Sequence, residues 1–312
     1  TFRRMFGGNS NLFESFVLQR NIMGPCWLEI NNCDFDSIKN SSHCQVEIAI
    51  NSPNFIKPIL DTKIPSPNLN LTSIAVQTTL TSKNVQEIVS VSLATFRNIP
   101  QDSLVSRDRQ PDEIVTLVRP VGSVAVPPGL AQLAEKQKFN LKILPNEKTL
   151  LNCLAALIKT ADPDVFIGHR LEAVSLNILI HRMYDLKCTT WSTFGRRNRK
   201  AWPDRFGMAG GAFSNSLQLR EIFQGRFLCD IANEMGQSVT PKCQSWDLPE
   251  MLQVVCHKKQ TPLEVNFNNE RYAEDANFLL LALKDVASNV RNIAEIGFEI
   301  QILSLSKQLT NL

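Results

Sequence analysis

The densest group of side chains that could bind a charged ligand is a basic cluster in the second half of the sequence. Four cations fall within five residues, Arg196, Arg197, Arg199 and Lys200, and Arg205 follows shortly after. Arginine forks match phosphate oxygens and displace counterions, so the cluster is a candidate contact for a nucleic-acid backbone. The alternative is a solvated loop, because the segment lacks helical periodicity. The net charge of +3 permits either role.

Residues that supply a catalytic base or a metal site are sparse. His169 follows Gly168 at the end of an expected strand, but no Ser/Asp or Cys partner has triad spacing, so a structural role is favoured. The eight cysteines form no C-x-x-C pair, and no second Cys/His pair stands near the adjacent pair Cys256-His257. The sequence therefore predicts no metal site, and reduced, mostly buried thiols. The four tryptophans are predicted to be core or loop anchors, with base stacking as the alternative for Trp202.

The composition is that of a soluble globular protein with room for two domains. Of the 312 residues, 43% are hydrophobic and 20% are charged. No apolar run is long enough to span a bilayer, and the N-terminus lacks a signal-peptide apolar region, so no membrane association is expected. The chain starts at Thr1 and stops at Leu312 within a helical pattern, which favours a fragment of a longer polypeptide.

The first part of the chain, residues 1–65, is predicted to be a small β-rich module. Strands are expected at Cys26–Ile30 and Cys44–Ile50, where aromatic and β-branched residues alternate loosely with polar ones. Four prolines within Pro53–Asn70 are typical of a linker. A second domain is then expected over residues 66–312.

The second domain shows strand patterns first and helical patterns later. Asn146 is a good N-cap for a helix that runs to Lys159, and Asp247 is the expected N-cap within a helix over Ser245–Val255. The last forty residues are expected to be helical, with an interruption near Ala287-Ser288-Asn289. The expected strands are Leu71–Leu80, Glu87–Phe96 and Ile114–Val118, which form an antiparallel meander, followed by Val165–Ile167 and Arg226–Asp230. This order is that of a ribonuclease-H-like (DnaQ-type) α/β fold.

Four separate segments resemble family B DNA polymerases. Asp162–Arg182 is similar to their second exonuclease motif, in which G-x-N-x-x-x-F-D opens a helix. Gly225–Asp230, followed by Ser245–Leu248, resembles the G-R-x-x-x-D…S-Y-x-L signature of their exonuclease domains. GPCWLE at residues 24–29 is similar to a segment of the N-terminal domain in eukaryotic replicative members, and residues 301–312 look like the helix that leads into the palm.

The same resemblance implies that the exonuclease positions are degenerate. Ser175 stands where the family has its metal-binding Asp, and Arg170 stands where it has Asn. The strand that matches the D-x-E motif contains Ser73 and Ala75 and no acidic residue. Asp275 alone survives, one residue closer to its Tyr than the Y-x-x-x-D motif requires. Its expected role is that of a solvated helix residue, and Asp230 is likewise expected to be a strand-end polar residue.

The resemblance therefore implies a fragment of a replicative DNA-directed DNA polymerase. This segment would be a non-catalytic exonuclease-like domain that supports the polymerase domain and the template-primer. The parent would use Mg²⁺ and a DNA template with an RNA or DNA primer, and would work in the nucleus with primase and accessory subunits. No cofactor is expected in this segment. The alternatives are an active metal-dependent 3′→5′ exonuclease with unusual ligands, or a protein-interaction module.

Overall fold

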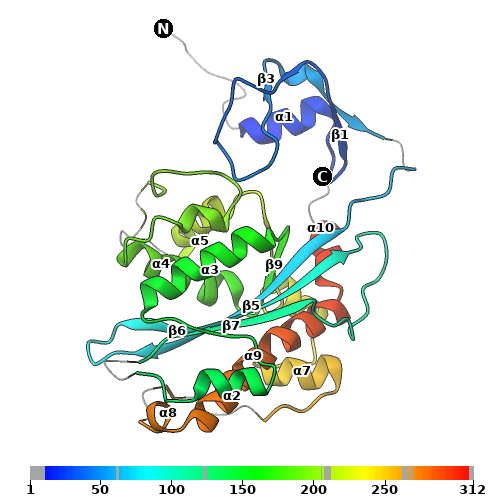
Figure 1. The fold of residues 1–312 in the computed structure, drawn as a ribbon. Helices are drawn as coiled ribbons and strands as arrows, with labels where there is room; N and C mark the ends of the chain where they lie inside the picture. Colours follow the sequence, from blue (N-terminus) through cyan, green and yellow to red (C-terminus); the bar gives the residue numbers. More distant parts are fainter. Residues whose placement is uncertain are drawn as a thin grey trace.

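The first folded segment is a small module that combines one helix with two short ribbons. The computed structural model describes residues 11–60, 63–121, 125–204, 206, 212–261, 266–267 and 270–308. Helix α1 (Leu12–Arg20) precedes two antiparallel pairs, β1 (Trp27–Ile30) with β4 (Ile56–Ile59) and β2 (Cys33–Asp34) with β3 (Ala49–Ile50). The module lies at the top of Figure 1, above the larger body.

The sequence pattern predicted this module only in part. The strand expected from Cys26 begins one residue later, at Trp27. The indole Nε1–H of Trp27 donates to the carbonyl of Pro65 (3.2 Å). The strand expected over residues 44–50 is wrong for most of its length, because only Ala49 and Ile50 pair. Helix α1 was not predicted at all. Its side chains are mostly exposed, so it lacks the apolar stripe that makes a helix visible in a sequence.

The larger body is built on a six-stranded mixed sheet; the strand patterns predicted five of its strands but missed the short one at Leu141–Ile143. The strand order is β10-β9-β5-β6-β7-β8. β5, β6 and β7 form the expected antiparallel meander, whereas β9 is parallel to β5, and β10 is parallel to β9. The strand bounds are β5 Leu69–Leu80, β6 Gln86–Ile99, β7 Glu113–Val118, β8 Leu141–Ile143, β9 Val165–Gly168 and β10 Phe227–Asp230.

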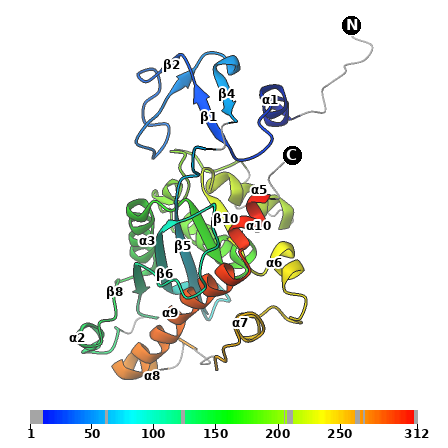
Figure 2. The ribbon, with the colours of Figure 1, turned by 90° about the vertical axis from the view of Figure 1, so that its right-hand side faces the viewer.

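Helices cover both faces of this sheet, which gives three layers (Figures 1 and 2). One face packs against α3 (Glu147–Ala161) and α4 (Asn177–Asp185), with Leu150, Leu154 and Phe166 in the core. The other face packs against α7 (Leu248–Cys256) and the long α9. The remaining helices are α2 Leu130–Lys136, α5 Ala212–Ile222, α6 Glu234–Val239, α8 Arg271–Glu274, α9 Ala276–Glu299 and α10 Ile302–Gln308.

Local chemistry accounts for several helix boundaries. Asn146 caps α3 as predicted, because its side-chain oxygen accepts the Thr149 N–H (2.9 Å). Asp247 occupies the cap position of α7, but its carboxylate binds Arg170 (2.9 Å) rather than the helix N-terminus. Helix α9 continues through residues 287–289, so the interruption expected there is wrong. The C-terminal helices instead break at Asp275 and at Ile300-Gln301, where Gln301 has a φ of 52°.

The long helix α9 approaches the sheet closely near its C-terminal end. A Cβ added at Gly297 would lie 2.2 Å from Ile167 Cδ1, so this glycine allows the helix to rest on β9. Phe298 packs edge-on against Phe96 of β6, with ring centroids 5.2 Å apart. Although α9 has 24 residues, no helix in the described part of the chain is long and apolar enough to cross a membrane.

Candidate functional site: a degenerate exonuclease centre

The strand that would supply the first pair of metal ligands is buried under helix α9. On β5, Leu71 and Ala75 belong to the apolar cluster of the α9 face, and alternation places Ser73 between them on the same face. Ser73 is fully buried, and its hydroxyl has no hydrogen-bond partner in the described structure. Ala75 is 9% exposed. These positions therefore present a hydroxyl and a methyl group in an apolar environment.

The second position lies just after β9, where the chain makes a tight turn into a helix. Gly168 lets the buried side chain of Leu171 pack closely there, because an added Cβ would lie 2.6 Å from Leu171 Cδ1 and would displace it. The N–H groups of Val174 and Ser175 both donate to the carbonyl of Arg170 (3.0 and 3.3 Å), which widens the first turn, residues 171–176, into a π-helix. Ser175 is half-buried on this turn. The predicted strand-turn-helix order is confirmed, but the π-helix was not foreseen.

Asp275, the third position, has a different role from the one that the sequence suggested. It precedes α9 and caps it, because one carboxylate oxygen accepts the N–H groups of Asn277 (2.9 Å) and Phe278 (3.2 Å). It is half-buried rather than a solvated helix residue. Nearby, Tyr272 is buried against the rings of Phe267 and Phe278. The carboxylate is thus already used by two main-chain donors.

These side chains do not fit a two-metal site. Divalent hard cations such as Mg²⁺ are held mainly by carboxylate oxygens, and two-metal catalysis requires both ions to be placed together. The matched positions offer two hydroxyls, one methyl group and a single carboxylate that caps a helix. Within the described residues, no group of three or more His, Cys, Asp or Glu side chains could hold a metal ion. We therefore derive no metal-dependent step at this centre.

Asp230 is a buried carboxyl close to this centre whose structural importance the sequence did not indicate. It ends β10 with 6% exposure, and its two oxygens accept the N–H groups of Leu171 (2.6 Å) and Ala232 (2.9 Å). Burial raises the pKa of this carboxyl above its ordinary value. Asp230 therefore ties the end of β10 to the turn after β9. In the sequence, only the position of Asp230 at the end of an expected strand could have indicated this role.

The basic cluster is largely tied to the protein itself. Arg196 donates through Nη2 to Asp164 (2.7 Å), and it also approaches Asp162 (3.5 Å). Arg199 forms an ion pair with Glu221. Arg197 and Lys200 are exposed, and they are the two members that remain candidates for phosphate contacts. Arg205 lies outside the described residues.

The same segment also anchors the N-terminal module. The Asn198 N–H donates to the carbonyl of Ser41 (2.9 Å), and the His43 N–H donates to the carbonyl of Arg196 (2.7 Å). Burial, with Lys159 and Arg226 nearby, lowers the pKa of His43. The sequence favoured neither this ordered docking segment nor its ion pairs. The docking partners are more than a hundred residues away in the chain, and the carboxylates of the ion pairs are 22 to 34 residues away.

The histidine and tryptophan that the sequence singled out, His169 and Trp202, contact other parts of the protein. A ring nitrogen of His169 lies 2.7 Å from the carbonyl oxygen of Trp246, which agrees with the structural role predicted for this histidine. Trp202 stacks on Trp191 and on Phe206, with ring centroids 4.3 and 4.9 Å apart, so protein rings already contact it. Four of the eight cysteines are buried, whereas Cys26 and Cys44 are exposed. The expectation of mostly buried thiols thus holds for half of them.

Comparisons with known proteins agree with this architecture. Residues 3–251 match the model of the family described as DNA polymerase family B, exonuclease domain. Over its whole length the chain is 50% identical to a DNA polymerase alpha catalytic subunit of Saccharomyces cerevisiae. It is 28% and 26% identical to the DNA polymerase alpha catalytic subunits of Xenopus laevis and Mus musculus. The chain spans about a fifth of the length of these three relatives (21%, 21% and 20% respectively).

Proposed function

Since the chain belongs to the exonuclease-domain family of the family B DNA polymerases, we propose that it is a non-catalytic exonuclease-like domain of a replicative DNA polymerase. The observation that carries this proposal is the chemistry of the matched positions. Ser73 and Ala75 lie in an apolar core, Ser175 carries no charge, and the Asp275 carboxylate caps a helix. Without grouped carboxylates, a water molecule cannot be activated between two metal ions.

The domain would contribute to the parent protein by position rather than by chemistry. We propose that the parent is a DNA polymerase alpha catalytic subunit that extends primers on a DNA template, with Mg²⁺ at a palm outside this chain. Primase and accessory subunits would bind other parts of the parent, and the nucleus would be its compartment. Residues 1–65 would be part of the N-terminal domain, and residues 66–312 would form the exonuclease-like domain, whose last helix would lead to the palm.

A direct nuclease assay tests the absence of activity. The chain is incubated with end-labelled single-stranded DNA in the presence of either Mg²⁺ or Mn²⁺, and the release of mononucleotides is measured. We expect none above the level of a buffer control. Release that follows the protein through purification and disappears with a chelator would refute the proposal in favour of an active exonuclease with unusual ligands.

A binding assay tests the proposed support of the template-primer. We expect the chain to bind primer-template weakly, with an affinity that falls as salt rises, because phosphate contacts release counterions. A complete lack of nucleic-acid affinity would favour the alternative of a protein-interaction module. The two assays are independent, since a domain without nuclease activity can either bind DNA or fail to bind it.

A further inference from the structure

Strand β10 is one open edge of the central sheet. It pairs with β9 on one side only, and it ends the strand order of the described sheet. The N–H groups of Phe227 and Ile231 donate toward β9, to Asp164 (2.8 Å) and Gly168 (3.0 Å). Along a strand, the N–H and C=O groups of successive residues point alternately to its two sides. The main-chain groups of Leu228 and Asp230 therefore point away from β9, toward the unpaired side. An unpaired edge of this kind, half-buried at Phe227 and Leu228, is a template for another strand.

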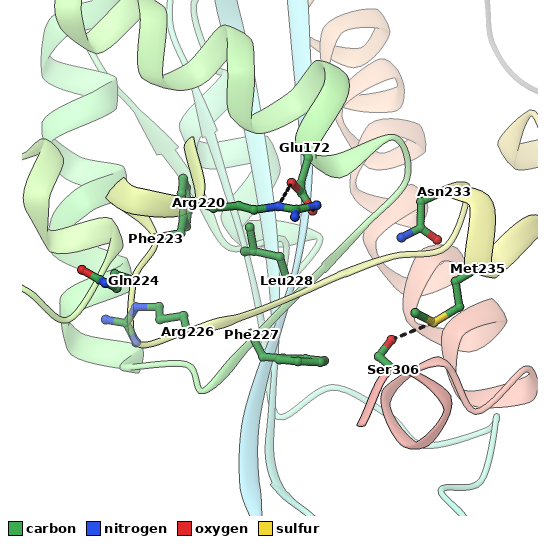
Figure 3. A pocket seen from close by; sticks show the side chains of 10 residues that line it. All are labelled: Glu172, Arg220, Phe223, Gln224, Arg226, Phe227, Leu228, Asn233, Met235 and Ser306. Carbon is green, nitrogen blue, oxygen red and sulfur yellow. Dashed lines mark hydrogen bonds and ion pairs between the residues drawn. The ribbon is translucent and has the colours of Figure 1, made fainter. Parts of the chain in front are cut away.

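A groove runs along this edge in the described part of the chain. It has a volume of about 400 Å³, and we call it the edge groove; its lining includes Glu172, Arg220, Phe227, Leu228, Met235 and Ser306. In Figure 3 the strand passes through the middle of the groove, with Arg220 and Glu172 on one side and Met235 and Ser306 on the other. A second hollow of about 630 Å³ shares Glu172, Arg220 and Asn233 with it, so the depression continues past the end of β10.

One exposed cation marks the wall of the edge groove. Arg220 of α5 is 62% exposed, and it holds Glu172 through Nε (2.8 Å) and Nη2 (3.3 Å). Its Nη1 has no hydrogen-bond partner among the described residues, so it can bind a carboxylate that enters the groove. The other arginine of the lining, Arg226, is almost fully buried and is committed to Asp162 (2.8 Å).

We propose that the edge groove receives an extended peptide segment of a second polypeptide, which adds as a strand beside β10 and places an acidic side chain against Arg220. The main chain of the peptide would exchange hydrogen bonds with Leu228 and Asp230, and its alternate side chains would face the two walls. The two hollows share part of their lining, so they form one continuous depression that can accept an extended segment.

The groove fits a peptide better than a nucleic acid. Its exposed arginine is already paired with Glu172, and Arg226 is buried, so the lining has no excess of free positive charge. Nucleic-acid binding depends on such an excess, because affinity comes from neutralised phosphates. A strand edge instead offers donors and acceptors in alternation, which the main chain of a peptide complements.

The test uses the whole 312-residue chain and random linear peptides displayed on phage. Peptides are selected on the wild-type chain and are then compared on Arg220→Glu. The matched control is Lys142→Glu, which makes the same change of charge at an exposed residue of β8, the opposite edge of the sheet. We expect selected peptides with an acidic residue, whose affinity falls at least about tenfold on Arg220→Glu and stays unchanged on Lys142→Glu.

Hydrogen exchange locates the bound peptide. The amide of Leu228 should exchange quickly in the free chain and become protected when a selected peptide binds, and a main-chain N-methylated version should give neither binding nor protection. Protection of the Leu228 amide in the free chain, or no enrichment over Arg220→Glu, would overturn the proposal. So would displacement of the peptide by a single-stranded oligonucleotide whose own binding requires Arg220, because the groove would then be a nucleic-acid site.

Discussion

Replacement of Ala75 by Asp is the sharpest test of the proposal that the exonuclease-like centre lacks activity. If only the missing carboxylates matter, Ala75→Asp should begin to rebuild the site. The structure predicts a loss of stability instead, because Ala75 is 9% exposed within an apolar cluster that includes Leu71 and Ile167 of the sheet and Ala294 of α9. A carboxylate at this position would lose its hydration without gaining a positive partner from these neighbours.

The size and the pH dependence of this loss follow from the expected titration of the new carboxyl. Burial in an apolar site raises a carboxyl pKa by about 3 units above its unfolded value of about 3.9. At about 1.36 kcal/mol per unit, the charge penalty is about 4 kcal/mol near neutral pH. Because the folded-state pKa is raised, this penalty is absent below about pH 4, grows as the pH rises and levels off above about pH 7.

Urea denaturation of Ala75→Asp and Ala75→Asn measures the effect. The Asn variant has nearly the same size but does not titrate, so it reports the cost of shape and polarity alone. We expect the Asp variant to be less stable than the Asn variant by about 4 kcal/mol at pH 7, and the two to be about equal near pH 4. Equal stabilities at pH 7, together with a Mg²⁺-dependent rise in the free energy of unfolding of Ala75→Asp, would refute the reasoning.

Other substitutions test the remaining positions. The Ser175→Asp variant should release no mononucleotides from labelled DNA with Mg²⁺ or Mn²⁺, because β5 still lacks carboxylates. Chelator-sensitive release would show that the metal ligands have been assigned to the wrong residues. Asp275→Ala should lower the free energy of unfolding by about 1 kcal/mol, and Asp275→Asn should lower it less, since both Asp and Asn caps accept hydrogen bonds. Divalent affinity, measured by calorimetry, should not change, and a large fall would mean that Asp275 binds metal. Arg196→Gln should destabilise the fold by about 1–3 kcal/mol in the same denaturation assay, because Asp164 loses its positively charged partner and keeps only the Asn70 N–H. A joint replacement of Arg197 and Lys200 by Gln should preserve stability and reduce the log–log salt slope of primer-template binding by about one unit for each phosphate that is no longer neutralised; an unchanged slope would leave these two residues as solvated surface.

The sequence alone determined the main strands and the family. Alternation of apolar residues along β5, β6 and β7 is a local property, and so is the Asn146 cap, so both could be read without knowledge of distant parts of the chain. The absence of charge at Ser175 and Ala75 is likewise a matter of residue type. These features depend on the residue itself or on residues close to it in the sequence, so the sequence is enough to predict them.

Only the tertiary structure decided what the other charged residues do. Arg196 was grouped with a basic cluster, but its partner Asp164 lies 32 residues earlier in the chain, and the fold brings the two within 2.7 Å. Asp275 looked like a solvated helix residue because its neighbours continue the helical pattern, yet the helix begins just after it, and its carboxylate faces the free N–H groups. The role of a charged side chain depends on which long-range partner reaches it and on how much water remains around it. Both are set by packing rather than by the local sequence.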